Sequence, residues 1–135
     1  MNVSSGENPL TSVGKFKQNP DKLRKLLENG ADSRINEKTS SRRTPLIDAA
    51  MSNSPEIVSV LLEYGADPRA QCDKAMLESI MDGSVQVVEL LLNSGVNPNE
   101  TCHESMKKGM LDWALKCRKA RDSKIIDLLI DHGAQ

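Results

Sequence analysis

The sequence offers few side chains that could catalyse a reaction or hold a metal ion. Its two histidines, His103 and His132, lack the nearby nucleophile and orienting group that nucleophilic catalysis needs. Cys102 precedes His103 directly, but Cys72 is distant, and no pair has the C-x₂-C or H-x₃-H spacing of a zinc site. The glycines form no phosphate-binding loop. We therefore expect no enzymatic activity, no catalytic residues, no metal and no cofactor.

Three basic clusters could contact phosphate groups. They are Arg42 with Arg43, Lys107 with Lys108, and the segment 116–119. No aromatic side chains are interleaved with them to stack on bases, so we do not expect nucleic-acid binding. Binding of another phosphate-rich ligand through the basic ends of the chain stays an alternative.

Composition and charge exclude several classes of protein. The 135 residues suit one domain, and the only aromatics are Phe16, Tyr64 and Trp113, fewer than usually line an enzyme pocket. The net charge of −1 argues against a protein that coats DNA. Residues 1–43 carry +4, residues 44–100 carry −7 and residues 101–135 carry +2, so the acidic middle would steer a basic partner.

Apolar runs and cysteines bear on where the protein acts. The apolar runs at 57–62 and 87–92 are short, so we expect no membrane-spanning helix, and residues 1–14 do not resemble a signal peptide. The three cysteines are odd in number and have no CxxC spacing. We expect them to be reduced thiols of an intracellular protein, cytoplasmic or nuclear.

Four segments share the same ending, which is two adjacent aliphatic residues, then any two residues, then glycine. Aliphatic residues also lie seven positions before each glycine, so each segment predicts one apolar helical face ended by a left-handed residue. Asn19-Pro20, Ser54-Pro55, Ser84 and Asp122 or Ser123 are the predicted helix starts. The segments are LRKLLENGAD (23–32), VSVLLEYGAD (58–67), VELLLNSGVN (88–97) and IDLLIDHGAQ (126–135).

An earlier helix is predicted before each of these segments. Residues 44–50, TPLIDAA, show it best, because Thr44 is a cap, Pro45 sits at the first helical position, and two alanines permit close packing. The same register covers residues 74–80 and 109–115, and more weakly residues 8–14.

These two motifs resemble those of ankyrin repeats. TPLIDAA is similar to the family's T-P-L-H-x-A-A opening, and LLEYGAD (61–67) is similar to its L-L-x-x-G-A-D close. The resemblance implies an all-α solenoid of helix–turn–helix repeats with projecting finger loops, over residues 8–135. The four repeats would cover about 8–43, 44–73, 74–108 and 109–135, after a flexible tail at 1–7.

The sequence departs from the family pattern in two ways. Ile47, Leu77 and Asp112 replace the usual histidine, so the hydrogen bonds that it makes between repeats are missing. The fourth repeat also carries an extra stretch, residues 117–123, between its two helices. Repeat arrays accept such insertions because each repeat contacts only its neighbours.

The resemblance places one register of the first helices on the concave, ligand-facing side. Asp48, Glu78 and Trp113 occupy it, and Trp113 is expected either to anchor a partner or to pack against Cys117 and the following loop. Methionines lie one helical turn further on. The expected partner-binding residues are Asp48, Met51, Glu78, Met81, Asp82, Trp113 and Lys116, with Arg42, Arg43 and Lys108 at the loop border.

The function that the resemblance implies is protein–protein recognition without catalysis. We expect a monomeric module, a scaffold or adaptor, that binds a partner protein through its concave face and finger loops. The acidic middle and the exposed methionines indicate a partner with basic and apolar groups. An alternative is a small ankyrin-type inhibitor that blocks an enzyme.

Overall fold

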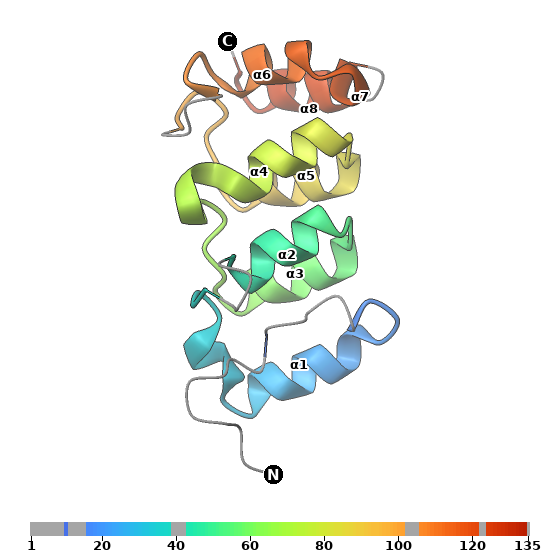
Figure 1. Cartoon of the computed structure of the whole chain (residues 1–135), viewed down its shortest axis with the longest axis vertical. Coiled ribbons are helices and arrows are strands. Elements are labelled where there is room, and N and C mark those ends of the chain that lie inside the picture. The colour runs from blue at the N-terminus through green and yellow to red at the C-terminus, as the bar shows by residue number, and fades with distance from the viewer. Residues whose placement is uncertain (1–9, 11–15, 39–42, 102–105, 122–123, 135) are drawn as a thin grey trace. The chain divides into compact units, whose positions relative to one another are not determined.

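The structure is a computed structural model that describes residues 10, 16–38, 43–101, 106–121 and 124–134 (Figure 1). These residues form helices and no strand, which confirms the all-α prediction. The chain divides into two compact units, residues 1–67 and 68–135, here called the N-terminal half and the C-terminal half. The division falls in the connection after Gly65. The expected tail at 1–7 lies outside the described residues.

The N-terminal half contains α1 (Pro20–Glu28), the short 3₁₀ helix η2 (Ala31–Arg34), α2 (Pro45–Met51) and α3 (Pro55–Glu63). Helix α3 packs against both α1 and α2. The predicted apolar face is buried, since Leu23, Leu27 and Leu61 are at most 1% exposed. Of the weakly predicted helix at 8–14, only Leu10 is described, and its side chain is buried.

The C-terminal half contains α4 (Ala70–Asp82), α5 (Val85–Asn93), α6 (Met110–Lys116), α7 (Arg118–Arg121) and α8 (Ile125–Asp131). Helices α6 and α7 pack against α4, and α8 packs against α5. This is the stacking of one helix pair on the next that a repeat fold requires. The extra stretch between the last two helices forms α7.

Helix α7 approaches the end of α4 so closely that a side chain at position 83 would be crowded. Gly83 follows α4 with a φ of +71°, and a Cβ atom at this position would lie 3.0 Å from the Cβ of Lys119 and 3.1 Å from its carbonyl oxygen. Backbone atoms cannot yield as a flexible side chain does. Gly83 therefore allows the contact between α4 and α7.

The predicted helix ends are confirmed at all four repeated glycines. Gly30, Gly65, Gly95 and Gly133 have φ angles between +95° and +110°. Residues other than glycine rarely adopt this backbone conformation. Each glycine thus ends its helix and turns the chain toward the next segment.

The predicted starts of α1, α2, α3 and α5 are right in position, but only the start of α2 is right in mechanism. Thr44 precedes α2 with extended backbone, ψ 159°, and its hydroxyl accepts a hydrogen bond from the Ile47 N–H at 3.3 Å. Asn19, Ser54 and Ser84 precede α1, α3 and α5, but their side chains make no capping hydrogen bond. Their ψ angles of 77–81° lie far from the extended value that aims a side chain at the first turn. For α8 the prediction that Asp122 or Ser123 caps the helix is wrong, because the residue that directly precedes α8 (Ile125–Asp131) is Lys124.

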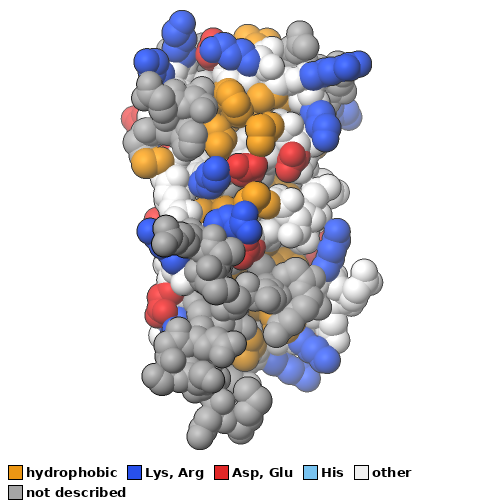
Figure 2. Space-filling model, viewed as in Figure 1, with side chains coloured by type: hydrophobic (Ala, Val, Ile, Leu, Met, Phe, Trp, Pro, Cys, Tyr) orange, Lys and Arg blue, Asp and Glu red, His pale blue; other side chains and the backbone are white. Residues whose placement is uncertain are grey.

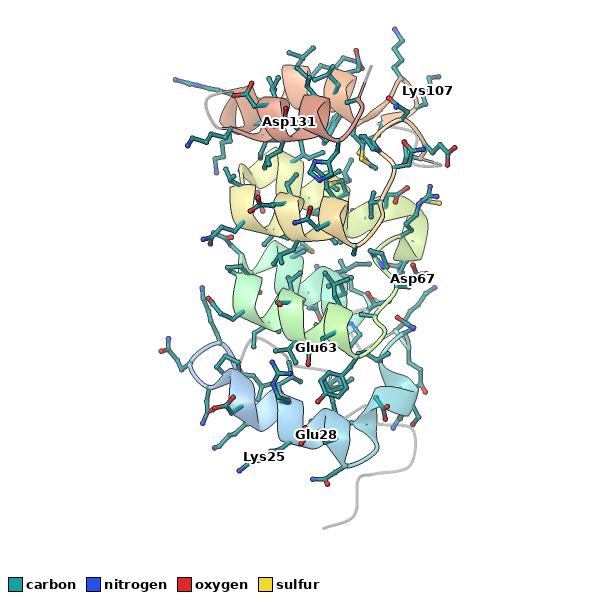
Figure 3. The ribbon with its side chains drawn as sticks, turned by 180° about the vertical axis from the view of Figure 1, so that it is seen from behind. Lys25, Glu28, Glu63, Asp67, Lys107 and Asp131 are labelled. Atoms are coloured by element: carbon teal, nitrogen blue, oxygen red, sulfur yellow. The ribbon has the colours of Figure 1, made fainter. Side chains whose placement is uncertain are left out.

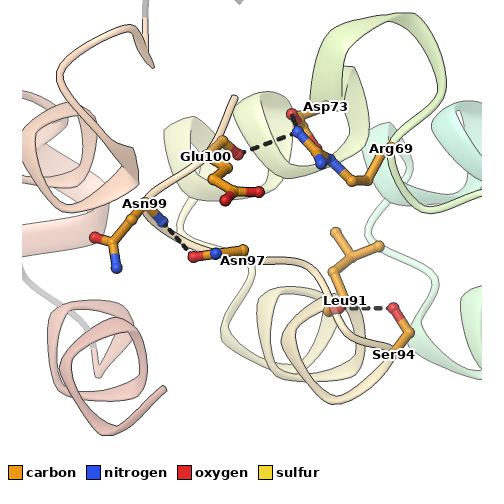
Figure 4. Close-up of polar contacts among 7 residues, drawn as sticks. All are labelled: Arg69, Asp73, Leu91, Ser94, Asn97, Asn99 and Glu100. Carbon is orange, nitrogen blue, oxygen red and sulfur yellow. Dashed lines mark hydrogen bonds and ion pairs between the residues drawn. The ribbon is translucent and has the colours of Figure 1, made fainter. Parts of the chain in front are cut away.

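The first turn of α4 is irregular and is held by an ion pair whose carboxylate is buried. Gln71, Cys72 and Asp73 all have φ between 55° and 64°, which is rare for residues other than glycine. The Asp73 carboxylate is fully buried and accepts two hydrogen bonds from Arg69, at 2.9 and 3.2 Å. Arg69 also donates to the carbonyl of Glu100 at 3.2 Å (Figure 4). Arg69 therefore links this turn by a hydrogen bond to the segment that follows α5.

The expectation of three reduced cysteines is wrong for Cys72, which is disulfide-bonded. Cys117 is a free, buried thiol, and burial raises its pKa. Cys102 lies outside the described residues. Disulfide pairing depends on the distance between cysteines in the folded chain, which their spacing in sequence does not reveal. The cysteines therefore no longer support an intracellular location.

Two asparagines supply hydrogen bonds between repeats that the sequence analysis did not foresee. Asn36 donates to the carbonyl of Gly65 at 3.3 Å and accepts from the Asp67 N–H at 2.7 Å. Asn99 donates to the carbonyl of Gly133 at 2.8 Å. In each half, the loop after one helix is thus tied to the glycine that ends the next repeat.

Removing one of these ties should weaken the C-terminal half measurably. We expect Asn99→Ala to lower the free energy of unfolding by about 1 kcal/mol, because it removes a hydrogen bond to a backbone carbonyl at a partly solvated site. Urea denaturation would measure the change. Asn97→Ala is no suitable control, because Asn97 accepts from the Asn99 N–H. Gln86→Ala, at an exposed amide side chain on α5, would show how much replacing an exposed amide costs.

None of the helices in the described part of the chain is long and apolar enough to cross a membrane.

Candidate functional site

In the N-terminal half, three of the predicted binding residues gather on α2. The Arg43 Nε atom lies 2.8 Å from the Asp48 Oδ1 atom, and the Arg43 Nη1 atom donates to the Met51 sulfur at 3.3 Å. Asp48 and Met51 are half-buried. The ion pair offsets the charge of Asp48 locally, so this cluster offers a mixed surface rather than an acidic one. Arg42 lies outside the described residues.

In the C-terminal half, the predicted residues of α4 differ in how far they are available to a partner. The Glu78 carboxylate lies 3.0 Å from Lys74, one helical turn earlier, and its side chain is 12% exposed. Met81 is 41% exposed. Asp82 is also exposed, and no ion pair joins it to any residue that the structure describes. Met81 and Asp82 are therefore the most accessible members of this group.

Trp113 on α6 is held against α4. Its indole Nε1–H donates to the backbone carbonyl of Leu77 at 3.3 Å, and the residue stays half-buried. Leu77 lies one helical turn before Met81, so the ring borders the turn that carries the exposed thioether. Figure 2 shows hydrophobic side chains gathered on this face over α4 and α6, with charged side chains around them. Part of the indole packs on the protein and part faces solvent.

The remaining predicted residues lie around α6. Lys116 is exposed and pairs with Asp112 at 3.2 Å, one helical turn earlier. Lys108 is exposed and directly precedes the glycine that starts the helix. The structure therefore brings Glu78, Met81, Asp82, Trp113 and Lys116 onto two packed helices. The predicted row that joins them to Asp48 spans both halves and stays a prediction.

The second helices of the N-terminal half present a different surface. Arg24 on α1 pairs with Glu63 on α3, and the hydrogen bond to Glu63 raises the pKa of Arg24 (Figure 3). Tyr64 donates to the carboxylate of Glu28 at 3.2 Å, and its pKa is raised first by desolvation and then by Glu28. These polar side chains pair with one another across the two helices. They leave little apolar surface for a partner.

Two exposed aliphatic side chains were missed by the sequence analysis. Leu115 is 50% exposed and Ile130 is 52% exposed, although both occupy positions that read as apolar core. The equivalent residues of the preceding repeat, Ile80 and Leu92, are buried, so the repeat register alone predicts burial at these positions. Among the residues that the structure describes, no group of three or more His, Cys, Asp or Glu side chains could hold a metal ion.

Comparison with known proteins gives one match. A search of curated proteins found no match to the chain. A family model described as ankyrin repeats in three copies matches residues 1–72, which is more than half of the sequence. The matched segment includes α1, α2 and α3 with their left-handed glycines, and the helix pairs of the C-terminal half follow the same register. The chain therefore belongs to the ankyrin-repeat family.

Proposed function

We propose that the chain is a non-catalytic adaptor that binds a partner protein through the exposed faces of α4 and α6. Ankyrin repeats are generally protein–protein interaction modules. The observation that supports this surface is the half-buried Trp113, fixed on α4 by its hydrogen bond to Leu77, beside the exposed Met81. A fold alone does not determine a function, so the proposal rests on the residues at this site.

Trp113 suits the role of an anchor because it is already ordered. An indole ring held by a hydrogen bond loses little rotamer freedom when a partner covers it. Tryptophan is also among the residues that most often dominate binding energy. Met81 adds a flexible side chain that can adapt to the partner's surface.

The charges near Trp113 indicate the chemistry of the partner. Asp82 is exposed, whereas Glu78 is paired with Lys74. A partner segment with an apolar side chain for Trp113 and Met81 and one basic group for Asp82 fits this surface best. The basic group would orient the partner, and the apolar contacts would set its residence time.

We expect Trp113→Ala to weaken binding of a captured partner by about 2 kcal/mol, the loss typical of an interface hot spot. Isothermal titration calorimetry with the partner purified from a capture experiment would measure it. Met81→Ala should weaken binding less, without affecting stability, because the side chain is 41% exposed.

The matched control is Glu89→Ala on α5, an exposed residue away from α4 and α6. It should leave the affinity unchanged. The proposal would be contradicted if Trp113→Ala and Met81→Ala bound the partner as tightly as the wild type while Glu89→Ala did not bind it. That result would place the binding surface on the second helices of the repeats. Circular dichroism would establish that each variant is folded.

A further inference from the structure

Met81 is the most exposed methionine among the residues that the structure describes, since it is 41% exposed. Met51 is half-buried, and its sulfur accepts a hydrogen bond from Arg43 at 3.3 Å. The other methionines in the described part of the chain are completely buried: Met76, Met106 and Met110. Met81 therefore carries the thioether that a small dissolved molecule can reach most easily.

Met81 also adjoins the indole ring of Trp113. The backbone carbonyl of Leu77 accepts a hydrogen bond from the indole Nε1–H at 3.3 Å. In an α-helix the same carbonyl accepts the backbone N–H four residues later, which is that of Met81. The indole is therefore held close to the residue that carries the exposed thioether.

Cys117, the free thiol that the structure describes, is a poorer target for an oxidant than Met81. A thiol reacts as its thiolate, and burial raises the pKa of Cys117, so that little thiolate forms. A thioether has no proton to lose, so its reaction depends mainly on access. Cys117 is 8% exposed, far less than Met81.

We propose that oxidation of Met81 to its sulfoxide is a switch that lowers affinity for the partner, an inference that rests on the proposed binding surface of α4 and α6. With hydrogen peroxide as the oxidant, the sulfur lone pair attacks one peroxide oxygen and the O–O bond breaks. The new S–O bond completes the sulfoxide, and the second oxygen takes both protons and leaves as water. Sulfur is oxidised and the peroxide is reduced. A methionine sulfoxide reductase reverses the change.

The sulfoxide lowers affinity because a bound partner has to cover it. Its oxygen is a hydrogen-bond acceptor that water satisfies while Met81 is exposed. A partner that covers Met81 removes this water, and burying a polar group without a hydrogen bond is costly. The sulfoxide also lacks the apolar, adaptable character of the thioether beside Trp113. We expect the affinity to fall by about tenfold.

Peptide mapping by mass spectrometry of the chain treated with graded hydrogen peroxide tests the selectivity. Met81 should be oxidised first among the methionines that the structure describes. Trp113 is the only tryptophan in the sequence, so its fluorescence gives a second readout that needs no partner. The emission should shift to longer wavelength as its neighbour becomes polar, and the reductase should reverse the shift. Oxidation of Met76 or Met110 as fast as Met81, or an equal shift in Met81→Leu, would overturn the proposal.

Calorimetry with the partner purified by capture tests the effect on binding. Peroxide should lower the affinity of the wild type but leave Met81→Leu at its own untreated value, because leucine has no sulfur to oxidise. Met51→Leu is the matched control, since it removes a methionine on α2 and should keep the full response to peroxide. If Trp113→Ala weakens binding but peroxide does not, the switch is refuted and the binding surface stands. If Trp113→Ala has no effect, the binding surface is refuted together with the switch.

Discussion

Replacing Leu91 with alanine is expected to lower the free energy of unfolding of the C-terminal half by about 2–5 kcal/mol. Leu91 lies on α5, is completely buried, and occupies the position four residues before the helix-ending glycine. Removing its side chain leaves a cavity that the packed helices can fill only in part. Urea denaturation followed by circular dichroism would measure the loss.

The neighbouring Leu90 is the matched control on the same helix. It is half-buried, so Leu90→Ala removes less buried surface and should cost about 1 kcal/mol. Equal losses for the two variants would mean that the repeat register does not decide which leucine faces the core. A loss near zero for Leu91→Ala would contradict the packing of α5 directly.

Replacing Arg69 with methionine is expected to lower the free energy of unfolding by about 2–3 kcal/mol. Loss of the arginine leaves the Asp73 carboxylate buried without its charged partner, and breaking a fully buried pair typically costs about 3–5 kcal/mol. The lower value follows because the Arg69 side chain is 42% exposed. Methionine preserves much of the aliphatic packing, so the change reports mainly on the charge and its hydrogen bonds.

Lys116→Met is the matched control, since Lys116 and Asp112 form an ion pair with the same four-residue spacing on α6. This pair is exposed, with side chains 59% and 34% accessible, and should contribute no more than about 0.5 kcal/mol. Asp73→Ala in the Arg69→Met background should recover part of the loss, because it removes the unpaired charge. If the double variant were less stable than Arg69→Met alone, the carboxylate would stabilise the turn independently of Arg69.

The parts of the fold that the sequence predicted are those set by local spacing. The aliphatic residues at fixed distances from glycine placed α1, α3, α5 and α8 correctly, since a helical face and a left-handed end depend only on neighbouring positions. The prediction that Thr44 caps α2 is also correct, and the extended backbone of Thr44 is what lets its side chain reach the first turn. Ser54 has the same kind of side chain but a different ψ angle, which sequence does not reveal.

The parts that the sequence did not predict depend on residues far apart in the chain. The hydrogen bond from Asn99 to Gly133 and the hydrogen bond from Trp113 to Leu77 each join distant segments. The resemblance predicted which register faces a partner, but not that Glu78 and Asp48 would be paired with nearby bases. Pairing of side chains is decided by rotamers and packing, which spacing along a helix only limits.

The close approach of α7 to Gly83 links two sequence features that would otherwise vary separately. A side chain at position 83 is disfavoured by the left-handed backbone itself, and the Lys119 backbone adds a close contact while α7 is present. In a variant without residues 118–121, asparagine, which adopts left-handed backbone readily, should be acceptable at position 83. The insertion therefore narrows what position 83 can hold, from residues that adopt left-handed backbone to glycine.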